Sequence, residues 1–531
     1  MPKLTIDGQA IEVPAGTTIL QACLQRGWEI PHYCYHEGLS IAGNCRICLI
    51  EVEKQPKLVI GCYTPVAEGM VVHTDSDKVK QARAAVMEFL LINHPLDCPI
   101  CDQAGECRLQ EYAVEYGDGT SRYTEPKLAL SKAIDIGPHV TLDQERCIQC
   151  SRCIRFCDEI TKTGELGFFQ RGERSQIGIF PGKRLDNPYS GNVVDLCPVG
   201  ALTLNEFRFK TRVWYLANTA TICAGCARGC NVVVGVGKQQ TLMTTRGQLD
   251  DRVKRIVPRV NEEVNGWWIC DEGRLSYEHE QKAPRLEAAR VAGKETAYDD
   301  AVKAAATKLA AAAKAGALGV IVSPRLVSED VFAWKSVVSA LGGGAFGVRS
   351  LLRGEDDTLL IRADKGANAQ GAAWILGAGA TERAVREAVA QGRVKTLLIL
   401  GDPLDAGDSA IVEAPAGSGP EVVYCGPFAS PSAARASVAV PCASWSEADG
   451  TYVNFEGRAQ RVRRCHLPQG EARPGWRVAA DLAEAAGAAA TGWSSAAEVL
   501  AALGRAIKEF EGISFEAMGL LGLKAPVAAG V

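Results

Sequence analysis

The sequence lacks long apolar runs and any marked excess of charge of one sign. No apolar stretch approaches the roughly 18–20 residues that a membrane-spanning helix needs; the stretches around residues 317–323 and 397–400 have the length of strands. The 58 Lys and Arg residues nearly balance the 62 Asp and Glu residues, so the formal net charge of -4 gives no general electrostatic reason to bind nucleic acid. We expect any membrane association to go through partner proteins.

The N-terminus lacks a charged segment followed by an apolar one, so the sequence predicts no secretory signal and a reducing compartment. The 531 residues are 47% hydrophobic and 23% charged, as in folded domains, and about three to five domains are expected. Cysteine, by contrast, is abundant: the chain has 20 cysteines, and 17 of them lie in residues 1–270. Where thiols stay reduced, dense cysteines at short spacings indicate metal ligation rather than disulfides.

The periodicity of apolar residues predicts a small α+β unit at the N-terminus and an α/β domain at the C-terminus. Two alternating runs around Asp7-Gly8 are typical of a hairpin, and a short helix should begin at Thr17 or Thr18 and end at Gly27. A longer helical pattern then runs until Pro95. After residue 282, alanine-rich helical segments alternate with short apolar strands, which predicts a parallel sheet in a domain of about 250 residues.

The first cysteine group has ten, two and thirteen residues between successive members: Cys34, Cys45, Cys48 and Cys62. Four thiolates from a loop on a small hairpin fold suit a 2Fe-2S cluster, in which each of two irons takes two cysteines. Plant-type ferredoxins have four residues where this sequence has ten, and a four-cysteine zinc site is the alternative. Cys23, inside the helical pattern, is interpreted as a buried small hydrophobe.

The second group lies in HPLDCPICDQAGEC and comprises His94, Cys98, Cys101 and Cys107. Three cysteines and a histidine can hold a 4Fe-4S cluster in which one imidazole replaces a thiolate. That replacement makes the cluster one charge less negative and should raise its potential. A zinc site with the same four ligands is the alternative.

The third group is CIQCSRCIRFC, followed after 39 intervening residues by a cysteine in LCPVGAL: its predicted ligands are Cys147, Cys150, Cys153 and Cys197. The C-x2-C-x2-C turn with a remote Cys-Pro is the bacterial ferredoxin arrangement of a 4Fe-4S cluster. The return segment has no second such turn, so Cys157 is left without a cluster and is interpreted as a packing residue.

The fourth group combines CAGCARGC with a distant cysteine in WWICDEGR, that is Cys223, Cys226, Cys230 and Cys270. C-x2-C-x3-C with a remote cysteine is a further 4Fe-4S pattern, and zinc is again the alternative. The three remaining cysteines, Cys425, Cys442 and Cys465, stand singly and are expected to be inert.

Taken in order, the four groups resemble the large iron-sulfur subunits of bacterial NADH-quinone oxidoreductase, the 75-kDa-type or G subunits of respiratory complex I. The segment CASWSEADGTYVNFEGRAQR, residues 442–461, is similar to that family's remnant of a molybdopterin-oxidoreductase domain. The resemblance implies that the first group binds the 2Fe-2S cluster and each of the others a 4Fe-4S cluster. The fourth cluster occurs in only some members, and the 39 residues before Cys270 suggest an insertion.

The resemblance also implies a multidomain α+β and α/β fold. Its expected parts are a ferredoxin-like 2Fe-2S β-grasp domain (1–75), a helical domain with the histidine-ligated 4Fe-4S cluster (76–137), a bacterial-ferredoxin-like 4Fe-4S domain (138–215), a molybdopterin-oxidoreductase-type 4Fe-4S domain (216–282) and a degenerate, truncated molybdopterin-oxidoreductase-like α/β domain (283–531).

The implied function is electron conduction through one 2Fe-2S and three 4Fe-4S clusters, with no molybdenum or pterin and no catalytic residues in this chain. Electrons would come from an NADH- and FMN-binding partner subunit and leave toward quinone, while membrane partners translocate protons. The expected location is peripheral, on the cytoplasmic side of the inner membrane. The sequence itself shows no flavin or nicotinamide site, because the turn at Gly377-Ala378-Gly379 lacks the third glycine of a dinucleotide motif.

Three alternatives remain open. A molybdopterin formate dehydrogenase-type subunit would need a longer pterin-binding region, and an iron-only hydrogenase would need further paired cysteines. A zinc-stabilised scaffold would be colourless and hold about one zinc per cysteine group.

Overall fold

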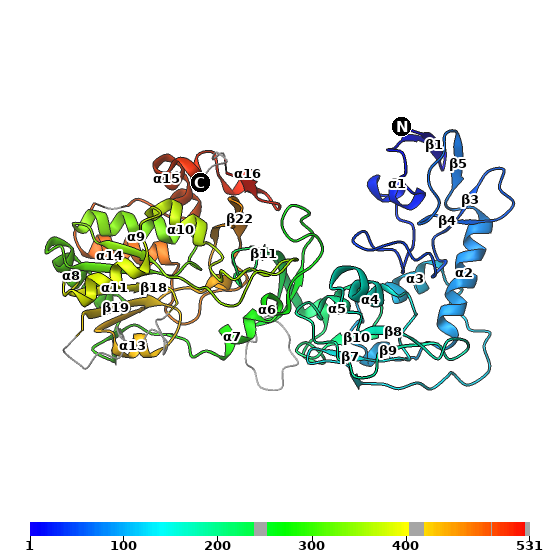
Figure 1. Cartoon of the computed structure of the whole chain (residues 1–531), viewed down its shortest axis with the longest axis horizontal. Helices are drawn as coiled ribbons and strands as arrows, with labels where there is room; N and C mark the ends of the chain where they lie inside the picture. Colours follow the sequence, from blue (N-terminus) through cyan, green and yellow to red (C-terminus); the bar gives the residue numbers. More distant parts are fainter. Residues whose placement is uncertain (238–251, 403–418, 490, 526–531) are drawn as a thin grey trace. The chain divides into compact units, whose positions relative to one another are not determined.

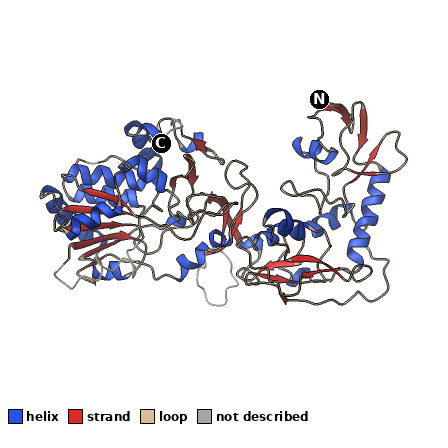
Figure 2. Ribbon diagram, in the orientation of Figure 1, coloured by secondary structure: helices blue, strands red, loops and turns tan. Residues whose placement is uncertain are grey.

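The computed structural model describes residues 1–237, 252–402, 419–489 and 491–525. The chain forms two compact units, residues 1–216 and 217–531. Each unit mixes helices and strands (Figure 1; Figure 2), which confirms the predicted mixed α and β composition. Among the described residues, none of the helices has the length and apolar character needed to cross a membrane.

The first unit opens with a five-stranded sheet in the order β2-β1-β5-β3-β4. Its elements are β1 (Lys3–Ile6), β2 (Gln9–Glu12), α1 (Ile19–Gln25), β3 (Leu49–Val52), β4 (Val59–Ile60) and β5 (Met70–His73). The predicted hairpin is confirmed: β1 and β2 pair antiparallel around Asp7 and Gly8, whose φ angles of 48° and 81° suit a two-residue turn. Thr18 caps α1 and forms a capping box with Gln21, and Gly27 follows the helix end with a φ of 73°.

The rest of the first unit is built from short elements around the second and third cysteine groups. The predicted long helix is α2 (Asp77–Ile92), which ends shortly before Pro95. The other elements are η1 (Cys98–Ile100), α3 (Arg108–Tyr116), β6 (Ile134–Asp135), β7 (Val140–Leu142), α4 (Arg152–Arg155), the π-helical turn η2 (Phe156–Ile160), β8 (Leu166–Phe169), β9 (Gln176–Ile179), α5 (Asn192–Leu196), β10 (Leu202–Leu204) and η3 (Val213–Tyr215). Strands β10, β7 and β6 form one small sheet, and β8 and β9 form another.

The second unit begins with a three-stranded sheet that carries the fourth cysteine group. Its strands are β11 (Leu216–Ile222), β12 (Asn231–Gly237) and β13 (Val253–Pro258), and the helices α6 (Asp271–Arg274) and α7 (Ser276–Lys282) follow. The insertion predicted ahead of Cys270 falls partly on residues 238–251, outside the described residues.

A seven-stranded sheet, in the order β15-β14-β20-β19-β18-β16-β17, forms the centre of the second unit. Its strands and the helices between them are β14 (Arg290–Val291), β15 (Lys294–Glu295), α8 (Tyr298–Lys314), β16 (Leu318–Val322), α9 (Ser328–Leu341), β17 (Ala345–Val348), α10 (Ala369–Leu376), α11 (Glu382–Ala390), β18 (Thr396–Leu400), β19 (Glu421–Gly426), α13 (Pro431–Arg435) and β20 (Val438–Pro441). The five strands from β20 to β17 are parallel, as predicted. Strands β14 and β15 add an antiparallel edge that the apolar pattern did not predict, because each has only two residues.

The faces of this sheet are covered by different helices. Side chains of β16 alternate: Val320 and Val322 lie in a core with α8, α9 and α14 (Gly475–Ala485), whereas Ile321 packs in a second core with α11 and α13. The remaining elements are η4 (Trp445–Glu447), β21 (Gly450–Val453), β22 (Arg458–Val462), α15 (Ala496–Ala506), η5 (Lys508–Phe510), α16 (Phe515–Met518) and β23 (Leu523–Lys524). Helices on both faces of a mostly parallel sheet are the arrangement expected of an α/β domain.

Candidate metal centres

The first cysteine group comes together beside the N-terminal sheet. Cys48 and Cys62 flank the hairpin of β3 and β4, and the N–H of Gly61 donates to the Cys48 carbonyl at 2.9 Å. Cys34 and Cys45 come from the preceding loop, where the Cys34 N–H donates to Cys45 Sγ at 3.5 Å. Hydrogen bonds from the Cys45 and Cys62 thiols lower the pKa of Cys34, and a hydrogen bond from Cys62 lowers that of Cys48. The four sulfurs are therefore neighbours, as a binuclear cluster requires.

The second group is split between a helix end and a loop. Cys98 and Cys101 bound the turn η1, and Cys107 caps α3. Cys98 is exposed, whereas burial raises the pKa of Cys107 to about 11. The Cys101 N–H donates to the Cys98 carbonyl at 3.4 Å, and the charges of both cysteines add to the rise in the pKa of Cys107.

His94 follows the C-terminus of α2, and its ring lines a cavity of about 620 Å³ together with Cys45 and Cys147. Burial lowers the pKa of His94 to about 4, so the imidazole is neutral at pH 7 and keeps the lone pair that a metal ligand needs. Its predicted place as the fourth ligand beside Cys98, Cys101 and Cys107 stays a prediction.

The third group converges most clearly. Cys147, Cys150, Cys153 and Cys197 all line one small cavity, whose other walls include Leu142, Ile177 and Val199. Burial raises the pKa of Cys197 to about 12 and raises that of the other three as well. Cys150 and Cys153 are buried, and Cys147 and Cys197 are half-buried. Four thiols facing one small cavity fit a metal cluster, because bound iron both deprotonates thiols and offsets the cost of burying their charge.

Cys157 does not line this cavity. Its side chain is fully buried at 0% exposure, and burial together with the Glu165 carboxylate raises its pKa. The Cys157 carbonyl accepts the N–H groups of Thr163 and Gly164 at 2.9 and 3.1 Å. This placement agrees with the interpretation of Cys157 as a packing residue. Cys23, also 0% exposed, lies in the core of the N-terminal sheet as expected.

The fourth group lies in the second unit, between β11 and β12 and at the start of α6. All four cysteines are at most 8% exposed, and the Cys223 N–H donates to the Cys230 carbonyl at 2.9 Å. The charges of Cys223, Cys226 and Cys270 all act on Cys230, whose pKa is raised mainly by burial. The remote Cys270 is therefore brought to the other three despite the long intervening segment.

Two glycines, which spacing alone did not single out, allow close packing at the sulfurs. A Cβ atom on Gly273 would lie 3.1 Å from Cys223 Sγ and 3.4 Å from Cys270 Sγ, and one on Gly200 would lie 2.1 Å from Cys101 Sγ. Gly200 belongs to the LCPVGAL segment of the third group, so that segment also packs against the second. The Arg108 N–H, next to Cys107, donates to the Pro198 carbonyl at 3.1 Å and joins the same two groups.

Two arginines join the first and third groups. Arg152 and Arg155 lie in α4, inside the segment RCIRFC, and donate to the carbonyls of Tyr35 and Cys34 respectively. Asn44 adds a hydrogen bond to the Gln149 carbonyl at 3.1 Å. The only sequence signal for these contacts is two arginines at a helical spacing of three. Cysteines of the first three groups meet at one apolar core: Cys34 and Cys150 lie within it, and Cys45, Cys107, Cys147 and Cys197 pack against it.

Among the residues that the structure describes, no three His, Cys, Asp or Glu side chains converge on a point that could hold a single metal ion.

Five family models match consecutive parts of the chain. They describe a 2Fe-2S iron-sulfur cluster binding domain (residues 2–77), an NADH-ubiquinone oxidoreductase-G iron-sulfur binding region (83–122), the ferredoxin-like domain of NADH-quinone oxidoreductase subunit 3 (137–203), an NADH-ubiquinone oxidoreductase NDSU1/NuoG-like 4Fe-4S domain (219–278) and a molybdopterin oxidoreductase (364–485). The chain is thus an iron-sulfur protein with domains for both 2Fe-2S and 4Fe-4S clusters.

The relatives identify the family more closely. The G subunit of NADH-quinone oxidoreductase from Rickettsia bellii is 49% identical over 313 residues, which are 58% of this chain and 44% of the relative. The NADH-ubiquinone oxidoreductase 75 kDa subunit of Reclinomonas americana is 47% identical over 278 residues, 52% of this chain and 38% of the relative. The chain is a homologue of these large iron-sulfur subunits, as the sequence motifs predicted, and spans less than half the length of the two relatives it matches here.

A solved structure of an NAD+-reducing [NiFe]-hydrogenase is 28% identical and covers 40% of this chain and 91% of its own. Its TM-score of 0.37 is too low to support any argument about the fold.

The third centre yields a paired prediction. Cys153→Ser should remove one cluster and about four iron atoms per chain, because Cys153 lines the cavity with the other three thiols. Cys157→Ser, at a cysteine four residues away that does not line the cavity, is the matched control and should keep full iron content. Iron analysis and electron paramagnetic resonance (EPR) of both variants check this. A cluster lost from the Cys157 variant would contradict the assignment.

Gly200→Ala should disturb the second centre without removing a ligand. The added Cβ would lie 2.1 Å from Cys101 Sγ, so the sulfur must move. We expect the EPR signal of that cluster to be lost or broadened. Gly379→Ala is the control, because nothing lies within 4 Å of its added Cβ. An unchanged spectrum for the Gly200 variant would show that Cys101 Sγ is free to move.

Proposed function

We propose that this chain is the iron-sulfur electron-transfer subunit of an NADH:quinone oxidoreductase, respiratory complex I. It receives electrons from the NADH- and FMN-binding subunit and passes them toward quinone, while membrane partners couple this transfer to proton translocation. The observation that carries the proposal is the placement of three thiol groups around one apolar core within the first unit. Homology to the large iron-sulfur subunits of that enzyme supports it independently.

The proposed cofactors are one 2Fe-2S cluster and three 4Fe-4S clusters, which would supply sites for single electrons. The proposed ligands are Cys34, Cys45, Cys48 and Cys62 for the binuclear cluster; His94, Cys98, Cys101 and Cys107 for the second; Cys147, Cys150, Cys153 and Cys197 for the third; and Cys223, Cys226, Cys230 and Cys270 for the fourth. Short loops place these thiols, and burial keeps water from most of them.

The residues around the ligands hold the groups at fixed separations. Arg152 and Arg155 tie α4 to the loop of the first group, and the Arg108 N–H ties α3 to the Cys197-Pro198 segment. Rigid separations suit electron transfer, since preorganised sites need little rearrangement when their charge changes. The fourth group lies in the second unit.

The finer organisation is also part of the proposal. The five parts are residues 1–75, 76–137, 138–215, 216–282 and 283–531, the last a degenerate molybdopterin-oxidoreductase-like domain without molybdenum or pterin. The partners are the NADH/FMN-binding subunit and other subunits of the peripheral arm, with the membrane arm contacted indirectly. The location is peripheral, on the cytoplasmic side of the inner membrane.

A molybdopterin formate dehydrogenase-type subunit is the competing function. The match of residues 364–485 to the molybdopterin oxidoreductase model is the observation in its favour. It requires molybdenum or tungsten bound to the second unit, whereas the electron-transfer proposal requires neither.

Ligation of a 4Fe-4S cluster by a histidine is the most unusual part of the proposal, and a variant of His94 tests it. His94→Ala should remove or convert the EPR signal of one 4Fe-4S cluster and leave the other three clusters, because only one ligand of one group is changed. His139→Ala is the control, since that imidazole pairs with Glu206 at 2.6 Å and belongs to no cysteine group. A spectrum of the His94 variant identical to the wild type would refute this ligand set.

A further inference from the structure

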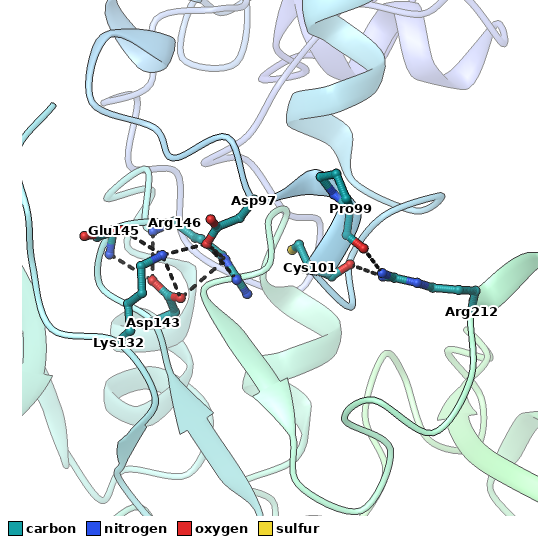
Figure 3. A network of polar contacts seen from close by, with 8 residues as sticks. All are labelled: Asp97, Pro99, Cys101, Lys132, Asp143, Glu145, Arg146 and Arg212. Carbon is teal, nitrogen blue, oxygen red and sulfur yellow. Dashed lines mark hydrogen bonds and ion pairs between the residues drawn. The ribbon is translucent and has the colours of Figure 1, made fainter. Parts of the chain in front are cut away.

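The loop that carries Cys98 and Cys101 lies between two arginines (Figure 3). On one side, Arg212 donates to the carbonyls of Pro99 and Cys101. On the other, Arg146 donates to Asp97 Oδ2 through Nε at 3.0 Å and Nη2 at 2.8 Å. Asp97 directly precedes Cys98, and Arg146 directly precedes Cys147 of the third group.

Arg146 is held in one place. It is 5% exposed, its Nε lies 3.3 Å from Asp143 Oδ2, and its N–H donates to Asp143 Oδ1 at 3.3 Å. Lys132 completes the network, with Nζ 2.6 Å from Asp97 Oδ2 and 2.7 Å from Glu145 Oε2. A buried guanidinium fixed by carboxylates keeps its charge at any working pH and is screened little by salt.

The Arg146 side chain reaches a proposed ligand of the second cluster. A Cβ built on Gly200 would lie 2.1 Å from Cys101 Sγ and 3.6 Å from Arg146 Cδ, so the arginine and the sulfur approach the same point. The fixed positive charge of Arg146 therefore lies beside Cys101.

We propose that Arg146, held by Asp97 and Asp143, raises the reduction potential of the second cluster through its positive charge. Reduction adds one negative charge, and a fixed positive charge nearby stabilises the reduced form. Asp97 has two opposing effects: it holds the guanidinium in place, and its own negative charge disfavours reduction. This inference rests on the proposed ligand set of His94, Cys98, Cys101 and Cys107.

Two explanations for the pair of Arg146 and Asp97, action through charge and support of the loop, predict different effects of substitutions. If Arg146 acts through its charge, Arg146→Gln lowers the potential and Asp97→Asn raises it, because Asp143 still holds Arg146 in the second variant. Arg146→Lys keeps the charge and restores most of the wild-type potential. If the pair only supports the loop, Arg146→Gln and Asp97→Asn disturb the cluster alike and Arg146→Lys gives no rescue.

The test is a redox titration of the purified complex that contains the chain, followed by EPR, with the wild type and these three variants. For Arg146→Gln we expect roughly a tenfold change in the reduction equilibrium of the second cluster, about 59 mV for one electron. The third cluster should shift less, because Arg152 and not Arg146 lines its cavity. Arg122→Gln is the control: it removes an arginine that also pairs with a carboxylate, Glu88, but is 83% exposed.

Opposite shifts for Arg146→Gln and Asp97→Asn, with rescue by lysine, support the inference. Unchanged potentials, shifts of the same sign, or a shift of equal size for Arg122→Gln overturn it. If Arg146→Gln does not assemble the cluster, the other two variants decide. A potential near that of the wild type for Arg146→Lys and a raised potential for Asp97→Asn support the inference, and any other result overturns it. If the EPR spectra of the wild-type complex and of His94→Ala are identical, the proposed ligand set is refuted instead, and with it the proposed function of this site.

Discussion

Buried thiol groups are the constraint on which the first unit depends. An isolated thiolate is costly inside protein, and burial raises the pKa of most of the proposed ligands toward the neutral thiol. A bound cation stabilises such groups in their charged form, so we expect metal binding and folding of these loops to be coupled. The residues around the thiols suit close packing of these groups. They include short turns, glycines that leave room for the sulfur atoms, and arginines that donate to the loop carbonyls.

The same contacts that hold each loop also join neighbouring loops. The LCPVGAL segment supplies Cys197 to the third group, places Gly200 against Cys101 of the second and accepts the N–H of Arg108. The helix α4 supplies Cys153 and sends two arginines to the loop of the first group. The loops of neighbouring groups are therefore in direct contact, which suits a protein whose centres must keep fixed separations.

Local patterns predicted most of this structure. The Asp7-Gly8 hairpin, the cap at Thr18, the end of α2 before Pro95 and the parallel strands of the second unit all depend on neighbouring residues, and all are found. The spacing C-x2-C-x2-C likewise specifies a tight turn, so the grouping of Cys147, Cys150 and Cys153 around one cavity was predictable. The Cys-Pro signal added Cys197 to this group. The role of Gly200, the pairing of Arg146 with Asp97 and the two-residue strands β14 and β15 were not. The first two depend on residues far apart in the sequence, whereas β14 and β15 have only two residues each and so show no periodic pattern.

The most direct test of the central claim is elemental: iron, acid-labile sulfide, zinc and molybdenum per chain, in protein purified without oxygen. One binuclear and three 4Fe-4S clusters require about 14 iron atoms, with matching sulfide and neither zinc nor molybdenum. Molybdenum or tungsten would instead indicate the formate dehydrogenase-type alternative. Several zinc atoms with little iron would contradict the account of the chain as an electron carrier.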